Sequence, residues 1–349
     1  MINRISAHRL GLNRIVAVIG GLLMAAAIGS AQTAGSYHLL KQIPVGSEGT
    51  WDYLAIDQGA RRLYVSHQTQ VEVIDIDTDT PVGKITGMNG VHGIAVAPAL
   101  GRGFITSGNT STVKMFDLKT LESIGDIPAG NGPDGVLFEP VTRRVFAFNH
   151  RGGTLTVIDA AAGKALENIE LGGQPEFPVT DGKGMVWVNL EDKSTLLKID
   201  AKAMKVLQRW PVAPCEAPAS MDMDHKNRRL FIGCNSKVMA VADADSGKIL
   251  TTLPIGEHVD ATAFDPETKL IFNANRASVT IIRQDAPDKY SEVQTVETLP
   301  RANTLALDLK TNRIYLSTAR FQEKPASTPD GKPQQAIVPG SFMVLVYGR

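Results

Sequence analysis

Residues 221–256 read MDMDHKNRRLFIGCNSKVMAVADADSGKILTTLPIG and contain four short segments in which apolar and polar side chains alternate. The segments are MDMD, RLFIGC, VMAVADA and ILTTLPIG, and the residues between them, such as HKNRR and DSG, are typical of turns. A period of two residues indicates strands that bury one face. The stretch therefore predicts four consecutive antiparallel β-strands.

The same order of strands and turns recurs along the chain. Each repeat begins with a strand that ends at an acidic or small residue, and the ends are separated by 40, 42, 42, 43, 41 and 43 residues. The seven ends are Asp57, Ala97, Glu139, Asp181, Asp224, Asp265 and Asp308. A period of about 40 to 45 residues with four strands per repeat is typical of β-propellers. We therefore expect an all-β, seven-bladed β-propeller with four antiparallel strands per blade.

The last blade lacks a strand at the C-terminal end of the sequence. The seventh repeat ends at its third strand, FMVLVYG, whereas residues 37–46, YHLLKQIPVG, match ILTTLPIG in pattern and in the terminal Pro-x-Gly. Closure by this N-terminal strand would remove an open sheet edge. We expect it to complete the ring, with the propeller domain spanning residues 32–349.

Residues 321–340 interrupt the last repeat between its second and third strands. The segment, FQEKPASTPDGKPQQAIVPG, contains four prolines where other repeats have a short turn. This composition predicts an irregular loop insertion. The loop could be a lid over one face of the ring or a solvated insertion without a role.

Residues 1–31 have the three parts of a secretory signal peptide. A basic start with three arginines precedes the apolar run IVAVIGGLLMAAAIG, and small residues follow at 29–31. The run has 15 residues, fewer than the roughly 20 that a membrane-spanning helix needs. We expect cleavage after Ala31 and a periplasmic or secreted protein, with a membrane anchor as the alternative.

The balanced charge argues against nucleic-acid binding, and the cysteine content fits an exported protein. The chain has 36 basic and 36 acidic residues, and loss of the three signal arginines leaves a net charge of −3. Cys215 follows the fourth strand of one repeat and Cys234 ends the second strand of the next, so both should reach the same face. In an oxidising compartment this pair predicts a disulfide, and without a CxxC spacing it is a poor zinc site.

The sequence resembles a known family in the RxLYVS and VxVID strands, the IPxG turns and the run GGQPEFPVTDGKGMVWVNLEDKSTLLKID. These features are similar to the YncE-like family of exported seven-bladed propellers built from YVTN-type repeats, over essentially all of the mature chain. The resemblance implies the fold. Its superfamily includes binding proteins, redox-enzyme subunits and lactone-cleaving enzymes, and one family member is associated with single-stranded DNA binding.

Candidate site residues come from loops that should share one face of the ring. In a four-stranded blade, the loops that enter the first strand and those that join the second and third strands emerge together, and we call this side the mouth face. No single repeat holds a complete constellation, so a site must combine residues from several blades. The candidate ligand-binding residues are Trp51, His67, His92, His150, Glu176, Glu216, His258, Arg276 and Arg320.

These residue types allow several chemistries. Imidazoles beside carboxylates could hold a divalent metal or act as acid and base in a ring-opening reaction, although loop histidines also cap strand ends. Arg276 and Arg320 could bind an anion in bidentate fashion, and Trp51 could form a stacking wall. We expect a monomeric binding or scaffold protein with a polar site for a small molecule or a protein partner. The alternatives are a metal-assisted hydrolase or lyase of the lactonase type and a single-stranded DNA-binding protein, and the sequence leaves open which residues would be catalytic.

Overall fold

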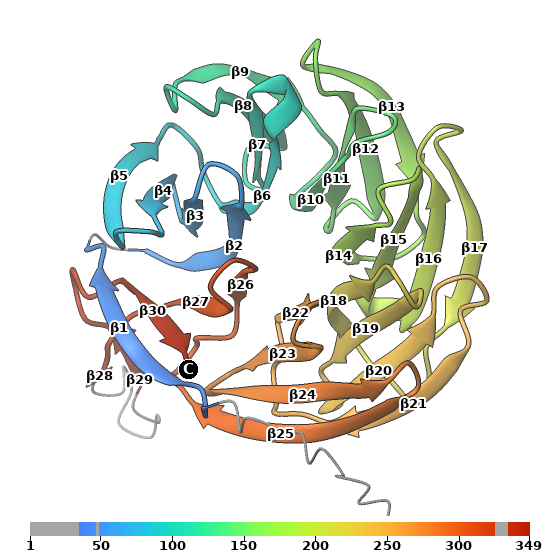
Figure 1. The fold of residues 1–349 in the computed structure, drawn as a ribbon. Helices are drawn as coiled ribbons and strands as arrows, with labels where there is room; N and C mark the ends of the chain where they lie inside the picture. Colours follow the sequence, from blue (N-terminus) through green and yellow to red (C-terminus); the bar gives the residue numbers. More distant parts are fainter. Residues whose placement is uncertain (1–34, 47–48, 325–333) are drawn as a thin grey trace, which may run out of the picture. The chain divides into compact units, whose positions relative to one another are not determined.

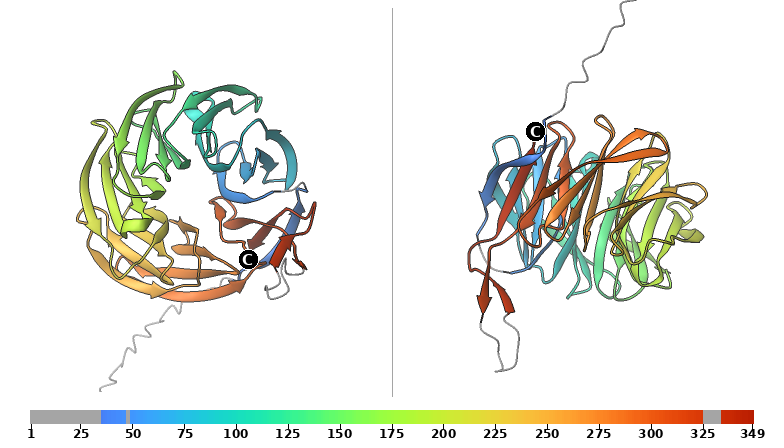
Figure 2. Two further views of the ribbon diagram at one scale, coloured as in Figure 1. Left: turned by 180° about the vertical axis from the view of Figure 1, so that it is seen from behind. Right: turned by 90° about the horizontal axis from the view of Figure 1, so that it is seen from below.

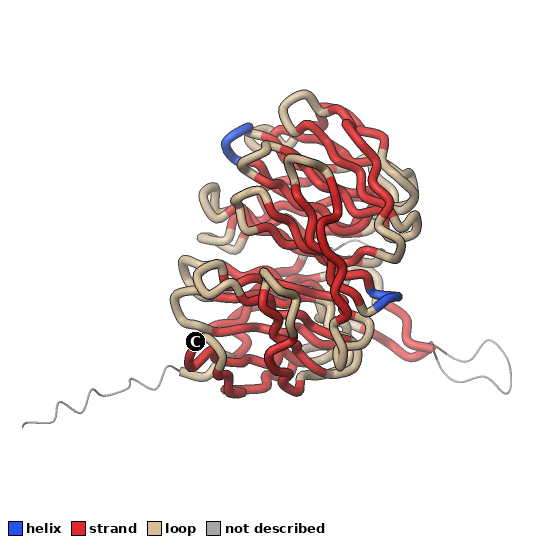
Figure 3. Tube along the Cα trace, turned by 90° about the vertical axis from the view of Figure 1, so that its right-hand side faces the viewer, coloured by secondary structure: helices blue, strands red, loops and turns tan. Residues whose placement is uncertain are grey.

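Each repeat folds into a four-stranded antiparallel sheet, as its alternating sequence predicts, and seven such sheets form a ring (Figure 1). The structure is a computed structural model that describes residues 35–46, 49–324 and 334–349. The predicted signal peptide lies outside the described residues. Strands and turns make up almost all of the described chain, with two short 3-10 turns, η1 (Pro98–Leu100) and η2 (Glu191–Lys193) (Figure 3).

The first six blades are each built from four strands that are consecutive in the chain. Blades 1 to 3 comprise β2 (Trp51–Asp57), β3 (Arg62–His67), β4 (Gln70–Asp75) and β5 (Thr80–Ile85); β6 (Val91–Ala97), β7 (Arg102–Ser107), β8 (Thr112–Asp117) and β9 (Ser123–Pro128); and β10 (Pro133–Glu139), β11 (Arg144–Asn149), β12 (Thr154–Asp159) and β13 (Lys164–Glu170). Blades 4 to 6 comprise β14 (Pro175–Thr180), β15 (Met185–Leu190), β16 (Thr195–Asp200) and β17 (Lys205–Pro211); β18 (Pro218–Asp224), β19 (Arg229–Cys234), β20 (Val238–Asp243) and β21 (Ile249–Pro254); and β22 (Ala261–Asp265), β23 (Leu270–Asn275), β24 (Ser278–Ala286) and β25 (Lys289–Glu297).

Blade 7 combines both ends of the propeller. It contains β26 (Leu305–Asp308), β27 (Arg313–Thr318), β30 (Met343–Gly348) and the N-terminal β1 (His38–Pro44). The pairing is antiparallel, with Gln42 opposite Leu345 and Pro44 opposite Met343. The predicted closure of the ring by the N-terminal strand is therefore confirmed.

The insertion in blade 7 is more regular than its composition suggests. Its ends form a two-stranded antiparallel hairpin, β28 (Phe321–Lys324) and β29 (Gln334–Ile337), so the expectation of an irregular loop is wrong for these residues. Strand pairing prevails because the prolines at 325, 329, 333 and 339 all fall outside the two strands. The two strands lie beside blade 7 and leave the centre of the ring uncovered (Figures 1 and 2).

The hydrophobic core lies between neighbouring blades. Tyr64 and Val73 of blade 1, for example, pack in one buried cluster with Ile105 and Phe116 of blade 2. Strands buried on both faces explain the apolar runs in the middle of each repeat. Among the residues that the structure describes, no helix is long and apolar enough to cross a membrane.

The acidic residue that ends the first strand of most repeats holds blades together at the face opposite the mouth. Asp265 of blade 6 accepts a hydrogen bond from Asn312 of blade 7, and Asp224 of blade 5 accepts one from Gln284 of blade 6. The same carboxylates cap their own turns, as Asp224 does for the amides of Lys226 and Asn227. This double role gives the repeat its regular acidic positions.

The two cysteines form the predicted disulfide. Cys215 precedes blade 5 and Cys234 ends its second strand, and their Cα atoms lie 5.5 Å apart. Both side chains are fully buried. The bridge therefore ties the loop entering blade 5 to the blade itself.

Candidate functional site

One position of the repeat faces the axis of the ring at the mouth face. It lies five residues before each strand end and is the second residue of the innermost strand in blades 1 to 5. We call the residues at this position the axial ring, and they are Asp52, His92, Asp134, Glu176, Ala219, Asp260 and Asn303. The ring thus contains four carboxyl groups and one imidazole.

A β-bulge accompanies the axial position. In blades 1 to 4 the pairing of the first two strands shifts between the residue before the ring position and the residue two after it, for example between Val91 and Ile94. Bulges redirect side chains next to binding sites. The innermost strands also approach closely there, since a Cβ on Gly93 would lie 2.5 Å from the carbonyl oxygen of Asp134. Glycine therefore permits the convergence of blades 2 and 3.

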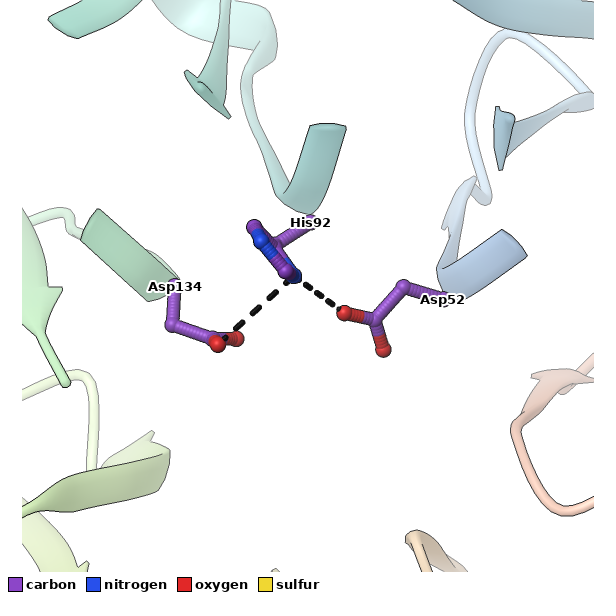
Figure 4. A group of neighbouring side chains, drawn as sticks. All are labelled: Asp52, His92 and Asp134. Carbon is purple, nitrogen blue, oxygen red and sulfur yellow. Dashed lines mark hydrogen bonds and ion pairs between the residues drawn. The ribbon is translucent and has the colours of Figure 1, made fainter. Parts of the chain in front are cut away.

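His92 bridges two carboxylates from the neighbouring blades (Figure 4). Its Nδ1 lies 2.5 Å from Asp52 Oδ2 and 3.6 Å from Asp134 Oδ2. Burial would lower the pKa of His92, but the hydrogen bond with Asp52 and the charges of both carboxylates raise it to about 9. In this half of the ring an imidazolium can compensate negative charge.

A second group of donors adjoins the first. His150, which follows β11, places its Nδ1 3.8 Å from Glu176 Oε1, and one donor atom each of Asp134, His150 and Glu176 lie within 4.8 Å of one another. Asp134 Oδ1 and His150 Nδ1 are buried, and neither has a hydrogen-bond partner among the described residues. These polar atoms are therefore turned inward without being satisfied.

Three carboxyl groups of the ring, those of Asp134, Glu176 and Asp260, hold protons more tightly than ordinary carboxyls. Burial, together with the neighbouring negative charges, raises the pKa of Asp134 to about 7. The same causes raise the pKa values of Glu176 and Asp260 well above their usual range. Asp260 accepts a hydrogen bond of 3.0 Å from Asn303. The ring is short of positive charge.

Two aromatic side chains directly follow residues of the axial ring in the chain. Tyr53 of blade 1 and Phe177 of blade 4 come from opposite sides and meet edge to face, with ring centroids 5.4 Å apart. The Tyr53 hydroxyl donates a hydrogen bond of 3.4 Å to Glu176 Oε2. We call the space that the axial ring surrounds at the mouth face the axial cup, and this aromatic pair lies beside it.

A side pocket of about 150 Å³ adjoins the cup between blades 7 and 1. Its lining includes Trp51, Arg301, Asp260 and Ile337 of the hairpin. The Trp51 indole donates a hydrogen bond of 3.2 Å to the carbonyl of Arg301. The pocket thus offers an aromatic wall, a guanidinium and a carboxyl group.

The structure brings some of the candidate residues together and separates others. His92, His150 and Glu176 meet in the axial cup, and Trp51 lines the side pocket. His67 packs in the interior instead, where its ring stacks on Phe342 with centroids 3.9 Å apart. The remaining candidates are exposed residues outside the axial ring: Glu216, His258, Arg276 and Arg320.

Several residues of the cup were absent from the candidate set. Asp52, Tyr53 and Asp134 lie in the innermost strands of their blades, and Asp260 directly precedes β22. Their common signal is the register of the repeat, because the three aspartates stand five residues before a strand end. Tyr53 has no such signal, since its role depends on a partner in the opposite blade.

Comparisons with known proteins support the fold. No family model and no curated protein matches the chain. A chain of the solved "Kuenenia stuttgartiensis Hydrazine Synthase" is similar, with a TM-score of 0.69 and 14% identity over 87% of this chain and 99% of that one. The "RRP9 WD40 repeats" give a TM-score of 0.74 at 9% identity (91% and 99% covered), and the "Structure of U3-55K" gives 0.73 at 8% identity (89% and 98%). These likenesses show the propeller fold alone, because a fold does not determine a function.

Proposed function

We propose that the protein is an exported binding propeller whose axial cup takes a small polar ligand. The ligand's positively charged or hydrogen-bond-donating groups face the carboxyl groups of the ring. The observation that carries the proposal is the axial ring itself, in which four of the seven equivalent positions hold carboxyl groups. Burying several carboxyl groups close together costs stability. The stability of the fold therefore does not explain why these groups converge, whereas ligand binding does.

The electrostatics of the cup favour a cationic group. Asp134, Glu176 and Asp260 have raised pKa values because they are buried and because neighbouring carboxylates repel their negative charge. A ligand that brings positive charge replaces the protons and removes this repulsion.

Export is part of the proposal. Residues 1–31 have the pattern of a signal peptide, and the strand motifs resemble those of the exported YncE-like propellers. The disulfide between Cys215 and Cys234 suits an oxidising compartment. A periplasmic or secreted binding protein accounts for these features together.

A metal-assisted hydrolase is the second candidate. Two sets of one histidine and two carboxylates, which share Asp134, could each hold a metal ion, and metal-bound water is a nucleophile for lactones. Hydrolysis of a lactone panel with and without Mn²⁺ distinguishes an enzyme from a binding protein. Single-stranded DNA is disfavoured at this site, because an acidic cup repels phosphates.

A thermal-shift screen tests the binding function. Organic cations such as spermidine, choline and arginine should raise the melting temperature of the wild-type protein, and neutral or anionic analogues should not. Asp260→Asn removes one ring charge and should weaken the response, whereas Glu216→Gln, an exposed change outside the ring, should not. If ligands shift both variants equally, the binding site lies elsewhere.

A further inference from the structure

We propose that Asp134, His150 and Glu176 bind one divalent metal ion within the axial cup. This inference rests on the proposed function, because it names a ligand for the same cup. Asp134 lies in β10, His150 directly follows β11, and Glu176 lies in β14. Blades 3 and 4 therefore both contribute donors. The chemical class is a divalent transition metal such as Mn²⁺ or Zn²⁺, since imidazole and carboxylate donors suit these ions.

The two groups of potential metal ligands in the cup differ in whether their members form hydrogen bonds with one another. In the set of Asp52, His92 and Asp134, a hydrogen bond of 2.5 Å joins His92 Nδ1 to Asp52 Oδ2. In the other set, the 3.8 Å between His150 Nδ1 and Glu176 Oε1 is too long for a hydrogen bond. The unsatisfied set is therefore the better metal site.

The separations suit a shared ion. Ligand atoms bound to one divalent ion at about 2.1 to 2.5 Å lie roughly 3 to 5 Å apart. The donor atoms of Asp134, His150 and Glu176 all lie within 4.8 Å of one another. Asp134 Oδ1 and His150 Nδ1 are buried without a hydrogen-bond partner among the described residues, which costs free energy. An ion bound between the three side chains would give at least one of these two atoms a partner.

Neighbouring groups hold the donors in place. The hydroxyl of Tyr53 donates to Glu176 Oε2, which leaves Oε1 toward His150. His92 faces Asp134 Oδ2, which leaves the other carboxylate oxygen without a partner among the described residues. Such outer contacts orient ligands in metal sites. The side chains of the three donors are 15 to 21% exposed, so an ion can enter from the mouth face.

Titration of the chelator-treated protein with Mn²⁺, followed by electron paramagnetic resonance, tests the site. We expect one bound Mn²⁺ per chain, with pulsed spectra that show coupling to an imidazole nitrogen. His150→Ala should remove that coupling, and His150→Ala and Glu176→Gln should each weaken affinity by more than about 10-fold. Glu216→Gln, an exposed change outside the axial ring, is the control and should change affinity by less than about 3-fold.

Each variant's melting temperature without metal shows whether it folds, and Glu176→Gln preserves shape if His150→Ala does not. The proposal is overturned if neither Mn²⁺ nor Zn²⁺ binds, or if binding survives both changes. In that case, a thermal shift by spermidine that Asp260→Asn weakens still supports the cup as a binding site. Absence of that shift as well would contradict the proposed function.

Discussion

Arg61 of blade 1 donates two hydrogen bonds of 2.6 Å to the carboxylate of Asp308 in blade 7, across the point where the ring closes. Asp308 is fully buried, and the Arg61 side chain is only 13% exposed. Burial would raise the pKa of Asp308, but hydrogen bonds from Arg61 and Thr311 lower it. This ion pair joins the first and last blades on the face opposite the mouth.

Arg61→Ala should destabilise the ring by about 3 kcal/mol, because it leaves the buried Asp308 charge without its partner. Urea denaturation at neutral pH measures the free energy of unfolding. Arg143→Ala is the control, since Arg143 occupies the same turn position in blade 3 and is exposed. It should change the free energy of unfolding by less than about 0.5 kcal/mol. Equal effects of the two changes would show that the closing pair contributes nothing specific.

Deletion of residues 32–46 should lower the melting temperature by at least about 10 °C and promote association. The deletion removes β1, with the buried Tyr37 and Ile43, and exposes the edge of β30. Thermal denaturation and light scattering measure the two effects, and a deletion of residues 32–35 alone is the control. A monomeric product with an unchanged melt would refute closure by β1.

Replacement of both Cys215 and Cys234 by Ser should cost about 3 kcal/mol of stability, because the disulfide restricts the unfolded chain over a separation of 19 residues. Denaturation under non-reducing conditions measures the loss. Reduction of the wild-type protein should lower its stability similarly and leave the double variant unchanged. Two reactive thiols in the unreduced, unfolded wild type would contradict the bridge.

Stability should depend on pH through Asp222 of β18. Burial raises the pKa of Asp222 from 3.8 to about 6, although the amides of Phe264 and Met223 donate to its carboxylate. The native state therefore binds more protons than the unfolded chain between these values, and the free energy of unfolding falls as the pH rises through this range. The contribution is on the order of 3 kcal/mol, at about 1.4 kcal/mol per pKa unit.

Asp222→Asn should flatten the pH dependence over that range, as urea denaturation at several pH values would show. Asp75→Asn serves as a comparison, because hydrogen bonds from Thr78 lower the pKa of this half-buried turn carboxyl, and its contribution therefore has the opposite sign. Identical pH profiles for Asp222→Asn and the wild type would exclude Asp222 as the source.

The fold could be predicted from the sequence because the repeat determines it. Alternation within residues 221–256 defined one blade, and the recurrence of its strand ends gave the number of blades. The N-terminal strand was predictable because one blade lacked a partner strand. The hairpin at β28 and β29 was missed, because four prolines suggested irregular structure although none interrupts its strands.

The cup could be predicted only in part, because loop position does not show which way a side chain points. His92 and Glu176 were predicted as site residues, whereas Asp134 was not among the candidate ligand-binding residues. Bulges in the first strands turn the axial residues inward, and bulges leave no clear mark in sequence. His67 lies in a mouth loop by sequence but packs on Phe342, which is 275 residues away.

Anomalous diffraction from crystals grown with Mn²⁺ or Zn²⁺ tests most directly whether the axial cup is the ligand site. We predict one strong peak in the cup, within about 2.5 Å of donor atoms of Asp134, His150 and Glu176. Crystals of Glu176→Gln grown with the same ion should show a weakened peak. An ion bound only outside the axial ring, or crystals with no ion in the cup, would contradict the metal site of Asp134, His150 and Glu176.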